Sequence, residues 1–78
     1  MTSLDISHNK LGILPGFIGS LTKLKALNLH STWITELPEW LDNLRNLEDL
    51  DISSNCFTQN IDEVYEEIYR KLPKLKRY

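Results

Sequence analysis

Hydrophobic and polar residues alternate along this chain in a pattern that returns after 23 residues. The first copy reads Leu4-x-Ile6-x-x-Asn9-x-Leu11-x-x-Leu14-Pro15-x-x-Ile18-x-x-Leu21-x-x-Leu24, the second reads Leu27-x-Leu29-x-x-Thr32-x-Ile34-x-x-Leu37-Pro38-x-x-Leu41-x-x-Leu44-x-x-Leu47, and a third begins as Leu50-x-Ile52-x-x-Asn55-x-Phe57. Repetition at a fixed period of this length indicates a stack of similar units, an architecture that usually serves to bind another molecule.

Each copy predicts a strand followed by a return segment. Leu4-Asp5-Ile6 alternates apolar and polar residues, which is typical of a strand with one buried face, and residues 27–29 and 50–52 repeat the alternation. Three such strands in register predict a small parallel sheet. Pro15 and Pro38 are predicted to occupy the first position of 3₁₀ or loosely helical segments, because the apolar residues that follow are spaced by three.

The third copy changes character after Phe57. Apolar residues over 61–72 recur at helical spacing, which predicts an amphipathic α-helix there. Asn60 is placed to cap its start, and Pro73 is placed to end it. Residues 75–78 resemble the beginning of a further copy, so Tyr78 is predicted to begin a fourth strand.

These residues resemble leucine-rich repeats of the class whose convex segment reads Leu-Pro-x-x-Ile/Leu-x-x-Leu, and the resemblance covers residues 1–57. It implies an α/β solenoid, with a short parallel sheet on the concave side, helical or 3₁₀ segments on the convex side and a longer C-terminal α-helix. We expect one domain over residues 1–78, with repeats at 1–23, 24–46 and 47–74 and a stub at 75–78. In this family Asn9 and Asn55 would point inward and satisfy backbone groups. Thr32 replaces this asparagine in the second repeat and has fewer hydrogen-bonding atoms, so we expect that turn to be held by fewer hydrogen bonds.

Composition narrows the function classes. The chain has 41% apolar residues, 26% charged residues and a net charge of −2, which is ordinary for a globular domain and gives no general attraction to nucleic acid or to an anionic membrane. The basic residues near the C-terminus are attributed to helix capping and solubility. No signal peptide precedes Met1, and the single cysteine, Cys56, cannot form an internal disulfide, which favours a cytoplasmic protein. Cys56 is expected to be a half-buried filler.

The residues that point out of the predicted sheet are the candidate contacts for a protein partner. They form polar columns across the strands, and Trp33 in the ascending loop is the best single aromatic anchor, although it could instead lie over Thr32 and cover that turn. We therefore predict a non-catalytic protein–protein interaction module. The candidate binding residues are Asp5, Ser7, Asn28, His30, Trp33, Asp49, Asp51 and Ser53.

The same face carries side chains that could also serve a catalytic or metal-binding role. Asp49 and Asp51 point to the same side of one strand, and His30 lies in the next column. A flat or gently concave sheet offers no cleft that excludes water, which an active site needs. The sequence therefore predicts no enzyme, no metal site and no cofactor.

The edges of the pattern suggest an alternative role. Met1 lies three residues before Leu4, so no capping element precedes the first repeat, and terminal repeats normally need polar caps. The chain could thus be a structural or terminal unit of a larger repeat array, or it could self-associate through its uncapped N-terminal edge.

Overall fold

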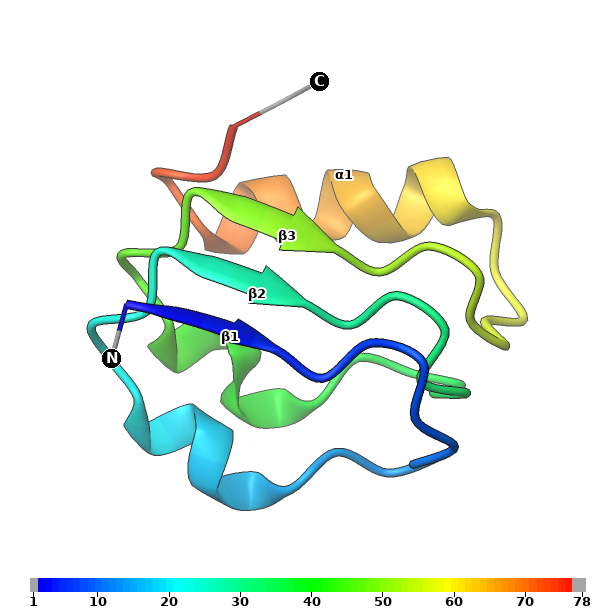
Figure 1. Cartoon of the computed structure of the whole chain (residues 1–78). Coiled ribbons are helices and arrows are strands. Elements are labelled where there is room, and N and C mark those ends of the chain that lie inside the picture. Colours follow the sequence, from blue (N-terminus) through cyan, green and yellow to red (C-terminus); the bar gives the residue numbers. More distant parts are fainter. Residues whose placement is uncertain (1, 77–78) are drawn as a thin grey trace.

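Three short parallel strands form one sheet in the computed structural model, which describes residues 2–76 (Figure 1). They are β1 (Ser3–Asp5), β2 (Ala26–Asn28) and β3 (Asp49–Asp51), in the order β1-β2-β3. Leu4 is paired with Leu27, and Leu27 with Leu50, so the register advances by one 23-residue copy from strand to strand. The predicted parallel sheet is confirmed, and each strand begins one residue earlier than the alternation suggested.

The return segments of the first two copies are 3₁₀ helices, as predicted. They are η1 (Gly16–Ser20) and η2 (Glu39–Asn43), and they lie on the opposite side of the molecule from the strands (Figure 1). The two prolines do not occupy the first helical position. Pro15 and Pro38 lie just before it, with extended backbone at ψ angles of 132° and 147°. Each proline ends the extended loop, and the helical turn starts with the residue after it.

Gly19 lets η1 and η2 approach each other closely. A Cβ atom added at this glycine would lie 2.6 Å from the Cβ atom of Trp40. Gly19 is buried, and Trp40 packs against the core from the next repeat. The absence of a side chain at Gly19 therefore makes room for the Trp40 side chain of the next repeat.

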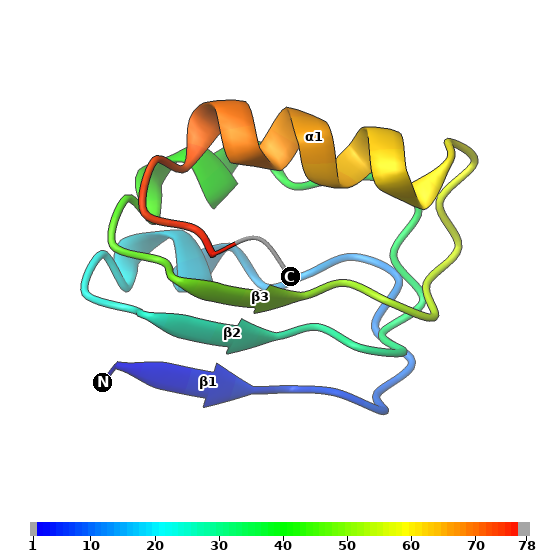
Figure 2. The same cartoon turned by 90° about the horizontal axis from the view of Figure 1, so that it is seen from above.

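The third copy contains α1 (Ile61–Lys71) in place of a 3₁₀ helix. The Asn60 side chain accepts a hydrogen bond from the Asp62 amide at 2.8 Å and so caps the helix. Figure 2 shows α1 running along the β3 side of the sheet. After the helix the repeat resumes its register, because the Leu75 amide bonds to the Leu72 carbonyl as the Leu47 amide does to Leu44. The predicted strand at Tyr78 lies outside the described residues.

Leucine and isoleucine side chains from all three copies form one core between the sheet and the return segments. Burial is less complete in the first copy: Leu11 is 38% exposed, whereas its equivalent Ile34 is 1% exposed. The most deeply buried members are Ile18, Leu24, Leu27, Leu29, Ile34, Leu44, Leu47, Ile52, Val64, Ile68 and Leu72.

The turn at Thr32 is well tied, contrary to the prediction. Thr32 is fully buried, and its hydroxyl donates to the Leu29 carbonyl at 2.9 Å. Asn55 of the next copy supplies the missing contacts: its Oδ1 accepts from the Thr32 amide at 2.8 Å, and its Nδ2 donates to the carbonyls of Leu29 and Ile52, each at 2.9 Å. The asparagine of one repeat therefore satisfies backbone groups of the repeat before it.

Candidate functional site

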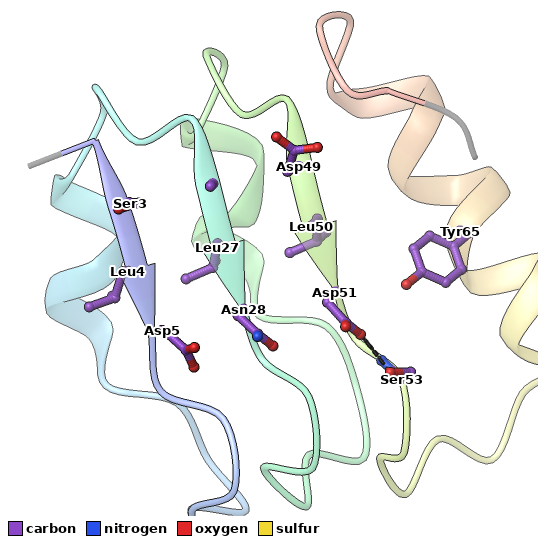
Figure 3. Close-up of a pocket in the computed structure, with 11 residues that line it drawn as sticks. Ser3, Leu4, Asp5, Leu27, Asn28, Asp49, Leu50, Asp51, Ser53 and Tyr65 are labelled. Carbon is purple, nitrogen blue, oxygen red and sulfur yellow. Dashed lines mark hydrogen bonds between the residues drawn. The ribbon is translucent and has the colours of Figure 1, made fainter.

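The strands present a groove of about 600 Å³ on the side of the sheet that faces away from η1 and η2 (Figure 3). We call its polar surface the open sheet face, defined by Ser3, Asp5, Ala26, Asn28, Asp49 and Asp51. The strand register places Ser3, Ala26 and Asp49 in one row and Asp5, Asn28 and Asp51 in the next. The predicted columns are thus present, and Ala26 leaves the middle of its row without a long side chain.

Five of the eight predicted binding residues line this groove: Asp5, Asn28, Asp49, Asp51 and Ser53. Ser7 and His30 follow the ends of β1 and β2 and contact the row that contains Asp5. Trp33 does not line the groove.

The side chains at the ends of the strands are fixed by local hydrogen bonds. Oδ1 of Asp5 accepts from the Ser7 amide at 2.9 Å and from its hydroxyl at 2.6 Å. Asp51 and Ser53 repeat this arrangement at the same two distances. In the middle copy Asn28 Oδ1 accepts from the amide of residue 30 at 2.9 Å. These hydrogen bonds therefore hold each of the polar side chains in a defined orientation at the end of its strand.

Both carboxyl groups have lowered pKa values. The hydroxyl and amide of Ser7 donate to Asp5 and lower its pKa. Burial by itself would raise the pKa of Asp51, but the two bonds from Ser53 outweigh it, and the net direction is downward. Both groups are therefore ionised at neutral pH, and among residues 2–76 no lysine or arginine lines the groove. The groove is negatively charged.

Two hydrogen bonds and one ring contact connect polar side chains of all three copies beside the groove. The Ser53 hydroxyl donates to Asp51, so its oxygen accepts from Nδ1 of His30 at 2.7 Å. The His30 ring in turn meets the ring of His8 edge-on, with 5.1 Å between centroids. Because the single hydroxyl proton of Ser53 is given to the carboxylate, it is not available to the imidazole. This arrangement positions side chains and does not activate a serine nucleophile.

Tyr65 of α1 forms one wall of the groove, a role that sequence reasoning missed (Figure 3). Its hydroxyl oxygen accepts a hydrogen bond from the Ile52 amide at 3.3 Å, next to β3. Burial raises the pKa of Tyr65. The side chain of Tyr65 thus adds a wall from α1 to the face that the strands form.

Trp33 lies in the loop after β2, where its backbone has a φ angle of 65°. This left-handed conformation is rare for a bulky residue. The side chain is 50% exposed, and the Lys10 Nζ lies 5.1 Å from the ring centroid. Trp33 thus contacts the preceding repeat through a cation–π interaction and still presents half of its surface to solvent.

The basic residues near the C-terminus tie α1 to the preceding copy. Lys71 Nζ lies 3.6 Å from a carboxylate oxygen of Asp42, and Lys74 Nζ lies 2.9 Å from Oδ1 of Asn46. This agrees with a structural role for the cluster. Cys56 is exposed, so the expectation of a half-buried filler was wrong.

Two further observations concern metals and membranes. Among residues 2–76, no group of three or more histidine, cysteine, aspartate or glutamate side chains is arranged to hold a metal ion. In the same part of the chain, no helix has the length and apolar character needed to cross a membrane.

Comparison with known proteins gives a family match over residues 1–57, to the family model described as "Leucine rich repeat". Similar proteins include an adenylate cyclase of Schizosaccharomyces pombe, which is 41% identical over 74% of this chain, and Receptor-like protein 34 of Arabidopsis thaliana, which is 39% identical over 73%. Putative disease resistance RPP13-like protein 2 of Arabidopsis thaliana is 41% identical over 63% of this chain. The matched regions span 4%, 6% and 6% of these proteins, respectively.

Proposed function

This chain belongs to the leucine-rich-repeat family, and on that premise we propose that it is a non-catalytic recognition module that binds a protein partner through the open sheet face and the adjoining loops. The observation that carries this proposal is the groove itself, because it spans all three strands and is lined by polar side chains from each of them.

Preorganisation supports the proposal. The carboxylates of Asp5 and Asp51 are held by two hydrogen bonds each in the absence of a partner. A surface that is ordered before binding loses little conformational entropy on association, so a modest contact area can still select a partner. The names of two relatives, a receptor-like protein and a putative disease resistance protein, are compatible with a recognition role for this kind of repeat.

The proposed architecture is an α/β solenoid in which residues 1–78 form one domain with repeats at 1–23, 24–46 and 47–74. The open sheet face would then be the concave surface, and η1 and η2 would lie on the convex one. The proposed contact residues are the eight predicted from the sequence, joined by Ala26 and Tyr65 from the groove.

We propose no catalytic activity, no cofactor and neither a nucleic-acid nor a membrane partner. The hydrogen bonds of Ser53 support the absence of catalytic activity, because its hydroxyl proton is donated to Asp51 rather than to His30. The acidic groove supports exclusion of polyanions from this face. Cytoplasmic location remains a prediction from the lone cysteine, and receptor-like proteins are among the relatives.

The recognition role is tested by blocking the groove without changing the core. Ala26 lies half-buried in the centre of the open sheet face, so Ala26→Trp would fill the groove. A displayed peptide library is selected against the unmodified protein and then counter-screened against this variant. Ser20→Trp, at the exposed end of η1, is the matched control. Sequences that bind the protein and the control but not Ala26→Trp support recognition through this face. Failure to enrich any sequence, or equal binding to all three proteins, would sink the proposal.

A structural role is the second candidate, favoured by apolar exposure in the first copy. Ile13 is 86% exposed and Phe17 60%, and Leu11 is far more exposed than its equivalent in the next copy. We propose under this alternative that the first copy stacks on a further repeat of a larger array or on another copy of the chain. Association that grows with protein concentration, together with a rising midpoint of thermal unfolding, would support it. A concentration-independent monomer would speak against self-association.

A further inference from the structure

A second groove adjoins the groove of the open sheet face. This second groove, of about 480 Å³, lies between β3 and α1 and shares Leu50 and Tyr65 with the first. Its other lining residues are Asp62, Glu66, Tyr69, Leu75 and Lys76. We call the two adjoining grooves together the path; its lining residues come from the three strands and from α1.

Most of the charged side chains along this path are acidic. Five carboxylate side chains line it, from Asp5, Asp49, Asp51, Asp62 and Glu66. In the described part of the chain the only lysine or arginine that lines it is Lys76, whose Nζ lies 3.8 Å from a carboxylate oxygen of Glu48. The whole chain has a net charge of only −2, so the negative charge is concentrated here while most cations lie elsewhere.

The shape of the path suits an extended chain. The short side chain of Ala26 leaves space above the middle strand of the sheet. The Tyr65 ring lies beside β3 as a wall (Figure 3). Its hydroxyl is engaged with the Ile52 amide, which fixes the ring beside the path. Parallel strands lie about 4.8 Å apart, so three strands and the helix are crossed by about five residues of extended peptide.

We infer that this path binds an extended, cationic segment of the protein partner, with a lysine or arginine side chain placed between the Asp51 carboxylate and the Tyr65 ring. The inference rests on the recognition role proposed above and adds the chemistry of the partner. The carboxylates supply charge complementarity, and the aromatic wall supplies a cation–π surface for the same side chain. An acidic segment would instead be repelled by carboxylates of the same charge.

The test uses a fluorescein-labelled octapeptide in which lysine and threonine alternate, with glutamine replacing lysine in the neutral probe. Binding to the full chain is followed by fluorescence anisotropy at about 50 mM and about 300 mM NaCl, because screening weakens exposed charge pairs. The groove variant is Asp5→Asn/Asp49→Asn/Asp51→Asn. Asparagine preserves the turn, since Asn28 already accepts the amide of His30 in the middle copy. The control Glu36→Gln/Glu39→Gln/Glu63→Gln removes the same charge from exposed positions outside the path.

The cationic peptide should bind the unmodified protein and the control equally, and should bind the groove variant about tenfold more weakly. Tyr65→Leu, which removes the aromatic wall, should also weaken binding. Circular dichroism confirms that each variant is folded. If the control variant loses as much affinity for the cationic peptide as the groove variant does, net charge alone explains the effect and the inference is overturned. Binding of the neutral probe as tightly as the cationic peptide would overturn it too.

The two proposals can fail separately. If the library selection enriches neutral or acidic sequences that Ala26→Trp no longer binds, the recognition role stands and the cationic chemistry is wrong. If the selection enriches lysine- or arginine-bearing sequences that Ala26→Trp no longer binds, both proposals stand.

Discussion

Oδ1 of Asn55 lies 2.8 Å from the backbone nitrogen of Thr32, a residue 23 positions earlier in the sequence. This oxygen also contacts the Thr32 hydroxyl at 3.1 Å and accepts from the Ile34 amide at 3.3 Å. One amide side chain thus connects two consecutive turns. Asn9, its counterpart in the first copy, is exposed, and its Nδ2 donates only to carbonyls of its own turn, those of Ile6 and Ser7.

Asn55→Ala should therefore lower the free energy of unfolding by about 2–4 kcal/mol, because several buried backbone groups lose their partner at once. Asn9→Ala should cost less than about 1 kcal/mol, since its two bonds lie at the surface. Urea unfolding followed by circular dichroism measures both changes. Equal costs would show that the contacts between repeats contribute nothing beyond the local turn.

Gly19→Ala should lower stability by about 1–3 kcal/mol, because the new methyl group would lie 2.6 Å from the Cβ atom of Trp40. Gly16→Ala is the matched control in the same 3₁₀ helix. A Cβ atom there has no neighbour within 4 Å, so stability should stay the same or rise slightly. Thermal unfolding of both variants distinguishes them, and a neutral Gly19→Ala would contradict the close packing of η1 on η2.

The sheet could be predicted from the sequence because its signals are local and repeated. Leu4, Leu27 and Leu50 have the same neighbours at the same spacing, so one register satisfies all three strands. The tie at Thr32 could not be inferred from its own repeat, because the asparagine that satisfies it belongs to the next one. The sequence of the second repeat alone therefore underestimates how many hydrogen bonds hold the turn at Thr32.

Ser53→Ala should raise the pKa of Asp51, because the hydrogen bond from the serine hydroxyl is the largest of the contributions that lower it. In the folded protein this pKa lies below its ordinary value of 3.8, so the carboxylate contributes stability above about pH 3.8 that is lost as the pH falls through the folded value. The variant should accordingly unfold at a higher pH during acid titration. Carboxyl NMR titration and acid unfolding test this, with Ser20→Ala as the control. An unchanged pKa in the variant would contradict the assigned cause.

Tyr65→Phe should lower stability by about 1 kcal/mol, because the buried Ile52 amide loses its acceptor. Faster hydrogen exchange of this amide should accompany the loss. The folded pKa of Tyr65 lies above its ordinary value of 10.0, so its contribution is complete below about pH 10 and is lost as the pH rises through the folded value. The Tyr65→Phe variant lacks this ionisable group, so its stability should fall less at alkaline pH. An alkaline unfolding profile equal to that of the unmodified protein would contradict this.

The candidate site was only partly predictable, because part of it depends on contacts between residues that are distant in the sequence. Side-chain alternation identified the outward residues Asp5, Asn28 and Asp51. Tyr65 looked like an ordinary member of the apolar helix face, because nothing in its local pattern tells where the helix lies relative to β3. The longer third copy places it beside the strand edge and creates the groove wall.

The most direct measurement of the central claim is an amide chemical-shift map of the ¹⁵N-labelled protein titrated with a peptide from the library selection. Recognition through the open sheet face predicts that the largest shifts occur at Asp5, Asn28, Asp51 and Ser53 and next to Tyr65, with η1 and η2 unaffected. Shifts confined to the exposed apolar residues of the first copy, Leu11, Ile13 and Phe17, would contradict this account and favour the structural role.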